Sequence, residues 1–185
     1  EGGVAEAPQT AEPREYALER HTLHMGTLIN AKLFGATPEA VKHYAIVFED
    51  KVTDYDDLMS VHKDTPLNEV NRRAGEPVEV PCEIADMTKQ ALAIADETNG
   101  AFEPMIGPVV NLWKIGFGGE HVPSDEAIAE AVSKVDRSKV RVWREGGRCR
   151  MQIAKGQSID MGAIAKGFIG QRLSDILKHE GMTRG

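Results

Sequence analysis

The part of the chain that most constrains its fold is a change of pattern between residues 148 and 181. Residues 148–153 alternate as a strand does, and apolar residues after 165 recur at helical spacing up to Gly181. Between them lies the run SIDMGAIAKGF, residues 158–168, which is rich in small residues. The sequence therefore predicts a strand-to-helix junction at which another group can approach the backbone closely.

A junction of this kind is a natural phosphate site. The first amides of a helix have no acceptor within the helix and lie at the positive end of its dipole. We expect Lys166 one turn into the helix, near any phosphate held there. A structural alternative stays open, in which the small residues pack on a sheet and Asp160 is only an N-cap. The spacing is neither that of a nucleotide-hydrolase P-loop nor that of a G-x-G-x-x-G dinucleotide fingerprint.

Composition narrows the classes of function. Hydrophobic residues at 41% and charged residues at 28% are typical of globular proteins, and no apolar run approaches the length that crosses a bilayer. The net charge of −7 argues against nucleic-acid binding, which needs a basic surface. The histidines are scattered and lack H-E-x-x-H spacing, so a zinc enzyme is not expected. A phosphate ligand would have to be held locally, with a divalent cation offsetting the repulsion.

The two cysteines, Cys82 and Cys149, lie far apart and have no zinc-binding spacing. They could form a disulfide, but buried free thiols are the expected state. Composition alone leaves the redox compartment open.

The chain as a whole predicts one α+β domain at residues 14–185, preceded by a flexible leader at residues 1–13. The acidic residues of the first helix, Glu49, Asp50, Asp54, Asp56 and Asp57, are expected on a solvated face. The prolines and the glycine in residues 103–108 predict an ordered apolar loop. Strands are expected at residues 16–23, 27–34, 77–80, 140–143 and 149–153, and helices at 38–59, 67–74, 81–99, 125–135 (buried face Ile128, Ala131, Val132 and Val135) and 165–181.

Five places, in order and at matching spacing, resemble the ApbE-type FAD:protein FMN transferases. Each motif is weak alone, but the set spans roughly residues 20–181. The places are Met25-Gly26-Thr27; Met59-Ser60 with residues 67–71; residues 100–103 with Gly107-Pro108; Asn111-Leu112-Trp113; and residues 160–167. The resemblance implies a T-fold-like domain with a mixed or antiparallel sheet flanked by helices.

The resemblance also implies FAD as the substrate and Mg²⁺ at its pyrophosphate. It assigns Asp160 and Lys166 to the nucleotide and the backbone carbonyl of Ala163 to the metal. No catalytic residue is assigned within these 185 residues. The residues that would line the flavin-nucleotide pocket are Met25, Ser60, His62, Ala101, Phe102 and Glu103.

The activity implied is transfer of FMN from FAD to a threonine or serine hydroxyl of an acceptor protein, with release of AMP. Two alternatives use the same pocket: a non-enzymatic FAD-binding protein, and a pyrophosphatase that yields FMN and AMP. The expected partners are flavin-acceptor subunits of membrane redox complexes. The resemblance implies a periplasmic lipoprotein, with the leader as its tether to the inner membrane.

The chain departs from the family pattern in three ways. His62 stands where tyrosine is frequent, so flavin affinity is expected to vary with pH, and Glu103 stands where aspartate is common. The chain ends at Gly185, before the family's further segment with aspartate and threonine metal ligands. We therefore expect the C-terminal part of the domain to be missing. The fold would then need that segment, or a second chain, to be complete.

Overall fold

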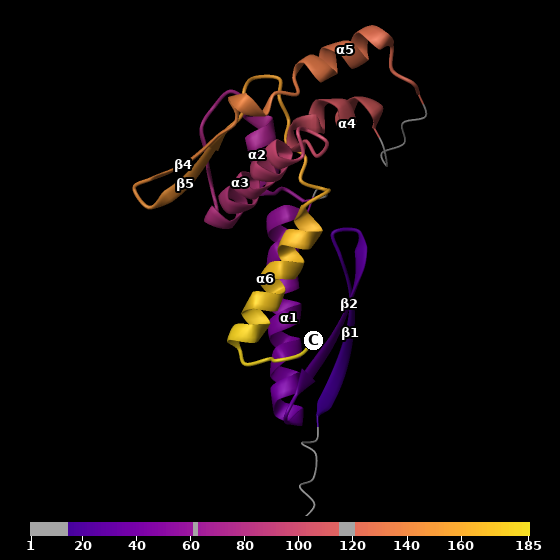
Figure 1. The fold of residues 1–185 in the computed structure, drawn as a ribbon, viewed down its shortest axis with the longest axis vertical. Helices are drawn as coiled ribbons and strands as arrows, with labels where there is room; N and C mark the ends of the chain where they lie inside the picture. The colour runs from indigo at the N-terminus through magenta and orange to yellow at the C-terminus, as the bar shows by residue number, and fades with distance from the viewer. Residues whose placement is uncertain (1–14, 61–62, 115–120) are drawn as a thin grey trace, which may run out of the picture. The chain divides into compact units, whose positions relative to one another are not determined.

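The computed structural model describes residues 15–60, 63–114 and 121–185. The chain divides into two compact units, and each is described by itself. Unit 1 is Glu1–Val52 with Leu173–Gly185, and unit 2 is Thr53–Arg172. Both units combine helices with antiparallel strands, which confirms the predicted α+β class (Figure 1). The predicted leader lies outside the described residues.

Unit 1 begins with a β-hairpin. Strands β1 (Tyr16–His24) and β2 (Thr27–Gly35) lie where the sequence predicts two strands, and they pair antiparallel from one end to the other. The turn between them consists of Met25 at φ 50° and Gly26 at φ 65°. Two successive residues at positive φ make the type of turn that matches the twist of a hairpin. Gly26 therefore serves the turn and forms no bulge.

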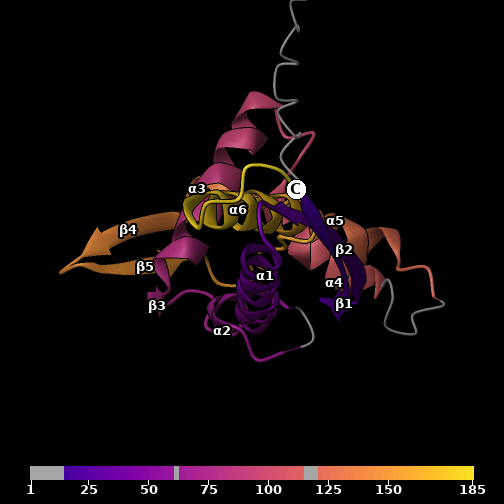
Figure 2. The same cartoon turned by 90° about the horizontal axis from the view of Figure 1, so that it is seen from below.

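Helix α1 (Pro38–Met59) begins where its sequence signals place it, because the Thr37 hydroxyl accepts the Ala40 amide at 3.1 Å. Within unit 1, α1 and the end of α6 (Ala165–His179) lie side by side, joined by His43 and Glu180 with an N–O distance of 2.6 Å (Figures 1 and 2). The face predicted to be apolar is buried: Val41, Tyr44, Ala45, Phe48, Val52, Tyr55 and Met59.

The expectation of a solvated acidic face on α1 is wrong for Asp56. This carboxylate is buried and makes an ion pair with Lys63 at 2.6 Å, and a buried carboxylate needs such a partner. No group of three or more His, Cys, Asp or Glu residues in the described part of the chain could hold a metal ion. No helix in the described ranges is long and apolar enough to span a bilayer.

Unit 2 is built on a three-stranded antiparallel sheet in the order β3-β5-β4, packed against α3. Its fully buried side chains include Ile84 and Met87 from α3 and Met151 from β5. The strands of this sheet are β3 (Val78–Val80), β4 (Arg141–Glu145) and β5 (Arg148–Gln152). The helices directly before and after β3 in sequence are α2 (Pro66–Arg72) and α3 (Cys82–Glu97).

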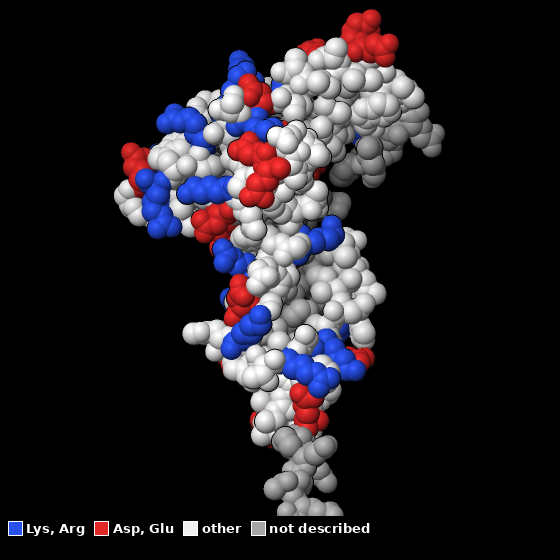
Figure 3. Space-filling model, viewed as in Figure 1, with Lys and Arg blue, Asp and Glu red and all other residues white. Residues whose placement is uncertain are grey.

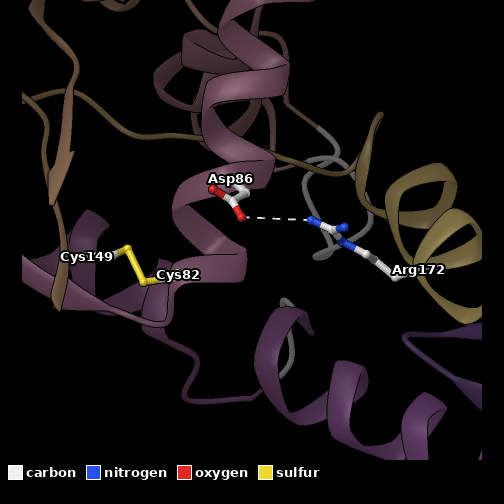
Figure 4. The surroundings of a disulfide bond; sticks show 4 residues. All are labelled: Cys82, Asp86, Cys149 and Arg172. Atoms are coloured by element: carbon white, nitrogen blue, oxygen red, sulfur yellow. Dashed lines mark ion pairs between the residues drawn. A yellow bond between two sulfur atoms is a disulfide. The ribbon is translucent and has the colours of Figure 1, made fainter. Parts of the chain in front are cut away.

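The expectation of free thiols is wrong, because Cys82 and Cys149 form a disulfide with a Cα–Cα distance of 5.2 Å (Figure 4). The pairing follows from the ladder. Val80 lies directly opposite Cys149, and Cys82 begins α3 two residues later. The two cysteines are 67 residues apart in sequence, so only the register of the sheet brings them together.

The expectation of an irregular loop at residues 103–108 is also wrong. A 3-10 turn, η1 (Pro104–Ile106), leads directly into α4 (Gly107–Trp113). Pro104 and Pro108 both lie in the first positions of these helices, where the missing amide has no helical partner to lose. The prolines therefore start helices here instead of preventing them.

Helix α5 (Asp125–Ser133) has its predicted cap, because the Ser124 hydroxyl accepts the Ala127 amide at 3.2 Å. Its predicted buried face is only partly right. Ala131 is buried, but Val132 is 52% exposed. A second 3-10 turn, η2 (Arg137–Lys139), connects α5 to the sheet.

Candidate functional site: the turn before helix α6

The predicted strand-to-helix junction is present, and we call residues 158–164 the junction turn. It folds tightly, because the amides of Ile164 and Ala165 both donate to the carbonyl of Met161, at 3.0 and 2.8 Å. The Asp160 carboxylate accepts the Gly162 amide at 2.7 Å. Asp160 therefore stabilises the turn itself and is not the N-cap of α6, which begins five residues later at Ala165.

The junction turn contains both buried and exposed residues. Ile159 and Met161 are buried and anchor the turn, whereas Gly162 and Ala163 are exposed. Lys166 is exposed as the second residue of α6, so it lies in the first turn of the helix and not one turn further in. An exposed amine, an exposed main chain and the start of a helix thus occur within four residues.

Three other segments of unit 2 fix the junction turn. From α2, the Asn71 side chain pairs with the main chain of Ile159. From η1, the carbonyl of Pro104 accepts the Asp160 amide at 2.8 Å. From α4, Asn111 donates to the Ser158 hydroxyl at 3.3 Å.

The start of α4 packs on the junction turn without spare room. A β-carbon at Gly107 would lie 2.5 Å from both the carbonyl oxygen and the hydroxyl of Ser158, closer than real β-carbons approach. Glycine is therefore required here by close contact and not by its backbone angles. The sequence motif contained Gly107 and Asn111 without indicating what they touch.

Glu103 is engaged on both carboxylate oxygens. One accepts the Met105 amide at 3.0 Å and so caps η1, and the other accepts Arg137 at 2.9 Å. Arg137 also donates to Asp96 at 2.7 Å. The bond to Asp96, and then that to Glu103, raise the pKa of Arg137 above its ordinary value. Sequence reasoning missed Arg137, because no local pattern distinguishes it from other surface arginines.

A cavity of about 490 Å³ lies beside this ion pair. Its walls combine charged and apolar side chains, since Leu92 and Val135 lie there together with the acids and Arg137. The residues that line it are Leu92, Asp96, Glu103, Val135, Asp136, Arg137 and Ser138.

The first half of α6 is tied to α3 near the disulfide. Arg172 lies 3.9 Å from Asp86 (Figure 4) and 4.0 Å from Glu83, and its guanidinium stacks on Phe168 at 4.9 Å. Tyr55 donates to Glu83 at 2.8 Å, and burial followed by this bond raises the pKa of Tyr55 above its ordinary value. The helix that follows the junction turn is therefore held by charge as well as by its apolar face.

The remaining predicted site residues are distributed as follows. Ala101 is exposed and Phe102 half-buried, immediately before Glu103, and Ser60 is buried directly after α1. Met25 belongs to unit 1, at the hairpin turn. His62 lies outside the described residues. Unit 2 thus brings Glu103, Asp160, Ala163 and Lys166 to connected segments.

These segments suit an anionic ligand of modest size better than a polyanion. Lysine and arginine side chains are intermixed with acids on the face drawn in Figure 3 and do not form one broad basic patch there. A nucleic acid needs such a patch, whereas a diphosphate needs a few donors at one point. At the junction turn, the exposed Lys166 is a donor of this kind, whereas the amides of Gly162, Ile164 and Ala165 already donate within the turn.

The model of the ApbE family matches residues 25–185, a range that includes every predicted site residue. The chain belongs to the ApbE family. A FAD:protein FMN transferase of Treponema pallidum is 33% identical over 182 residues, which cover 95% of this chain and 50% of the relative. A FAD:protein FMN transferase of Salmonella typhimurium is 29% identical, over 98% of this chain and 53% of the relative.

Solved structures confirm the fold. The ApbE protein of Thermotoga maritima has a TM-score of 0.78 at 24% identity, and the match covers 90% of this chain and 54% of that one. This chain therefore spans about half the length of the ApbE proteins that it matches.

Proposed function

We propose that the full-length protein transfers FMN from FAD to a threonine or serine hydroxyl of an acceptor protein and releases AMP. Family membership supports flavin transfer in general. The observation that supports the specific proposal is the junction turn, where an exposed lysine and a tightly fixed main chain lie at the start of a helix. A diphosphate is the part of FAD that such a site binds best.

The residues of this chain would act by position and charge. In the reaction, the acceptor oxygen forms a bond to the phosphorus of the FMN half, the P–O bond to AMP breaks so that AMP leaves with the electron pair, and the hydroxyl proton is released to solvent. Phosphoryl transfer of this kind needs alignment and neutralisation of charge more than covalent catalysis. Lys166 would neutralise phosphate charge, and Asp160 would keep the turn in shape while its outer oxygen accepts a donor from the nucleotide.

The proposal includes Mg²⁺ at the pyrophosphate, which when bound would offset the phosphate charge. Mg²⁺ prefers oxygen ligands and retains several waters, so the carbonyl of exposed Ala163 is a suitable contributor. The described residues offer no cluster of acidic ligands beside it. We therefore propose that the charged ligands come from the length of the family that this chain does not span.

We further propose a periplasmic protein tethered to the inner membrane, whose acceptors are flavin-bearing subunits of membrane redox complexes. The Cys82–Cys149 disulfide supports an oxidising compartment, because disulfides persist there and are rare in the cytosol. The tether and the acceptors follow from the resemblance of the sequence alone.

The test is a reaction of the full-length protein with FAD, MgCl₂ and an acceptor peptide that contains threonine. We expect AMP in solution and a fluorescent, covalently flavinylated peptide. Lys166→Ala should lower kcat/KM about tenfold or more, because it removes a charge beside the phosphates. Lys178→Ala is the matched control, since Lys178 is exposed in the last turn of the same helix.

Each other outcome has a defined meaning. AMP without labelled peptide would replace the transferase by a pyrophosphatase, and tight FAD binding without AMP would replace it by a binding protein. Equal activity of Lys166→Ala and Lys178→Ala would remove Lys166 from the site.

A further inference from the structure

Asn71 makes a paired contact with the junction turn that no role in the proposed reaction yet explains. Its amide nitrogen donates to the Ile159 carbonyl at 3.0 Å, and its amide oxygen accepts the Ile159 amide at 2.8 Å. The two residues are 88 positions apart in sequence. One side chain thus satisfies both main-chain groups of Ile159, as a neighbouring strand would.

The burial of Ile159 makes this pairing hard to replace. The residue is 3% exposed, and a buried main-chain group that loses its hydrogen-bond partner destabilises the fold. The contact needs a donor and an acceptor side by side, which asparagine supplies. Aspartate has the same shape but, when ionised, turns a second acceptor toward the carbonyl.

Asn71 is itself held firmly by helix α2. The Thr65 hydroxyl caps the first turn by accepting the Asn68 amide at 3.3 Å, and Leu67 and Val70 are buried on the same helix. We call the paired hydrogen bonds between Asn71 and Ile159 the Asn71 clamp. Because α2 holds Asn71 in place, this clamp determines where Ile159 lies. Asp160 follows Ile159 directly, and Ala163 and Lys166 follow within seven residues.

We propose that Asn71 is a positioning residue for nucleotide binding, which sets the junction turn so that Asp160, Ala163 and Lys166 meet one diphosphate. The inference rests on the proposed function and adds to it a residue that would not touch the ligand. Gly107 and Asn111 act on Ser158, at the beginning of the turn. Asn71 acts one residue later, immediately before Asp160.

The test compares Asn71→Asp with Asn68→Asp in the full-length protein. Asn68 lies one turn earlier on α2 and donates to the Lys63 carbonyl, so its substitution adds the same charge without contacting the turn. In sequence, the charged Arg72 follows Asn71 and the charged Asp160 follows its partner Ile159. FAD affinity is measured by equilibrium titration from about pH 8 to about pH 5.

At the upper end of this range we expect Asn71→Asp to weaken FAD binding about tenfold or more relative to wild type. Toward the lower end, protonation of the introduced carboxyl restores a donor, so the ratio to wild type should fall severalfold. Asn68→Asp should follow the wild-type pH profile. A loss of the same size at every pH would contradict the proposed contact, because protonation of the introduced carboxyl restores its donor.

A second readout does not depend on FAD. Hydrogen exchange at the Ile159 amide should accelerate about tenfold or more in Asn71→Ala, which removes the acceptor of this amide, and not in Asn68→Ala. If exchange changes as expected but wild type does not bind FAD, the proposed function fails and the clamp stands. If wild type binds FAD and Asn71→Asp binds equally at every pH, the positioning role is overturned.

Discussion

The junction turn of unit 2 and the hairpin turn of unit 1 both contain predicted nucleotide contacts, but they are fixed in different ways. The junction turn receives side chains and carbonyls from α2, η1 and α4, up to 88 residues away in sequence. The turn at Met25-Gly26 follows from the β1–β2 ladder that joins directly to it. Distant contacts fix one turn and local backbone geometry fixes the other.

The two units also differ in the residues that can report on their unfolding. Unit 2 contains the disulfide and both tryptophans, Trp113 and Trp143. In unit 1, Leu23 and Leu28 pair next to the hairpin turn and are 72% and 61% exposed. Tryptophan fluorescence therefore reports on unit 2, and hydrogen exchange of the hairpin amides reports on unit 1. Each substitution can be followed in its own unit.

The largest expected effect comes from the disulfide. Replacing Cys82 and Cys149 together by serine should lower the free energy of unfolding of unit 2 by about 4 kcal/mol, because the bond closes a loop of 67 residues in the unfolded chain. Urea unfolding followed by tryptophan fluorescence measures this loss. The double variant should be insensitive to reductant, which is the control. If hydrogen exchange of the hairpin amides shows an equal loss of stability, the disulfide stabilises both units and not unit 2 alone.

The second effect tests the close contact at the junction turn. Gly107→Ala should destabilise unit 2 by about 2–3 kcal/mol, because the new methyl group collides with Ser158. The control is Gly170→Ala in α6, where a β-carbon would meet nothing within 4 Å. Alanine there should stabilise the helix by about 0.5–1 kcal/mol. Equal urea midpoints for the two variants would contradict the packing described at the turn.

Much of the fold could be predicted because its signals are local. The apolar face of α1 repeats at helical spacing, and the cap at Thr37-Pro38 fixes where that helix begins. The hairpins follow from alternation and from glycines at the turns. The prediction of a loop at residues 103–108 is wrong because proline interrupts a helix only beyond its first turn, and Pro104 and Pro108 lie within the first turns of η1 and α4.

The parts that could not be predicted depend on which segments meet in space. The disulfide needs the register of β3 against β5, and burial of Asp56 needs Lys63 beside it. The motif residues near the junction turn were correctly placed on a strand-to-helix connection. The clamp by Asn71 could not be read from a sequence in which its partner is 88 residues away.

The smallest effect tests the turn that is fixed locally. Met25 adopts φ 50°, where a side chain other than asparagine or glycine is strained, so Met25→Asn should stabilise the hairpin by about 0.5–1 kcal/mol. Slower exchange of the hairpin amides measures this gain. If Met25 also contacts the nucleotide, as the resemblance in sequence implies, the same change should weaken FAD binding severalfold in the full-length protein. Lys114→Asn is the matched control, since Lys114 has φ 49° at the end of α4 and no proposed contact with FAD. A stabilised hairpin with unchanged FAD affinity would leave Met25 as a turn residue alone, and the nucleotide contacts proposed here would then lie in unit 2, where distant side chains fix them.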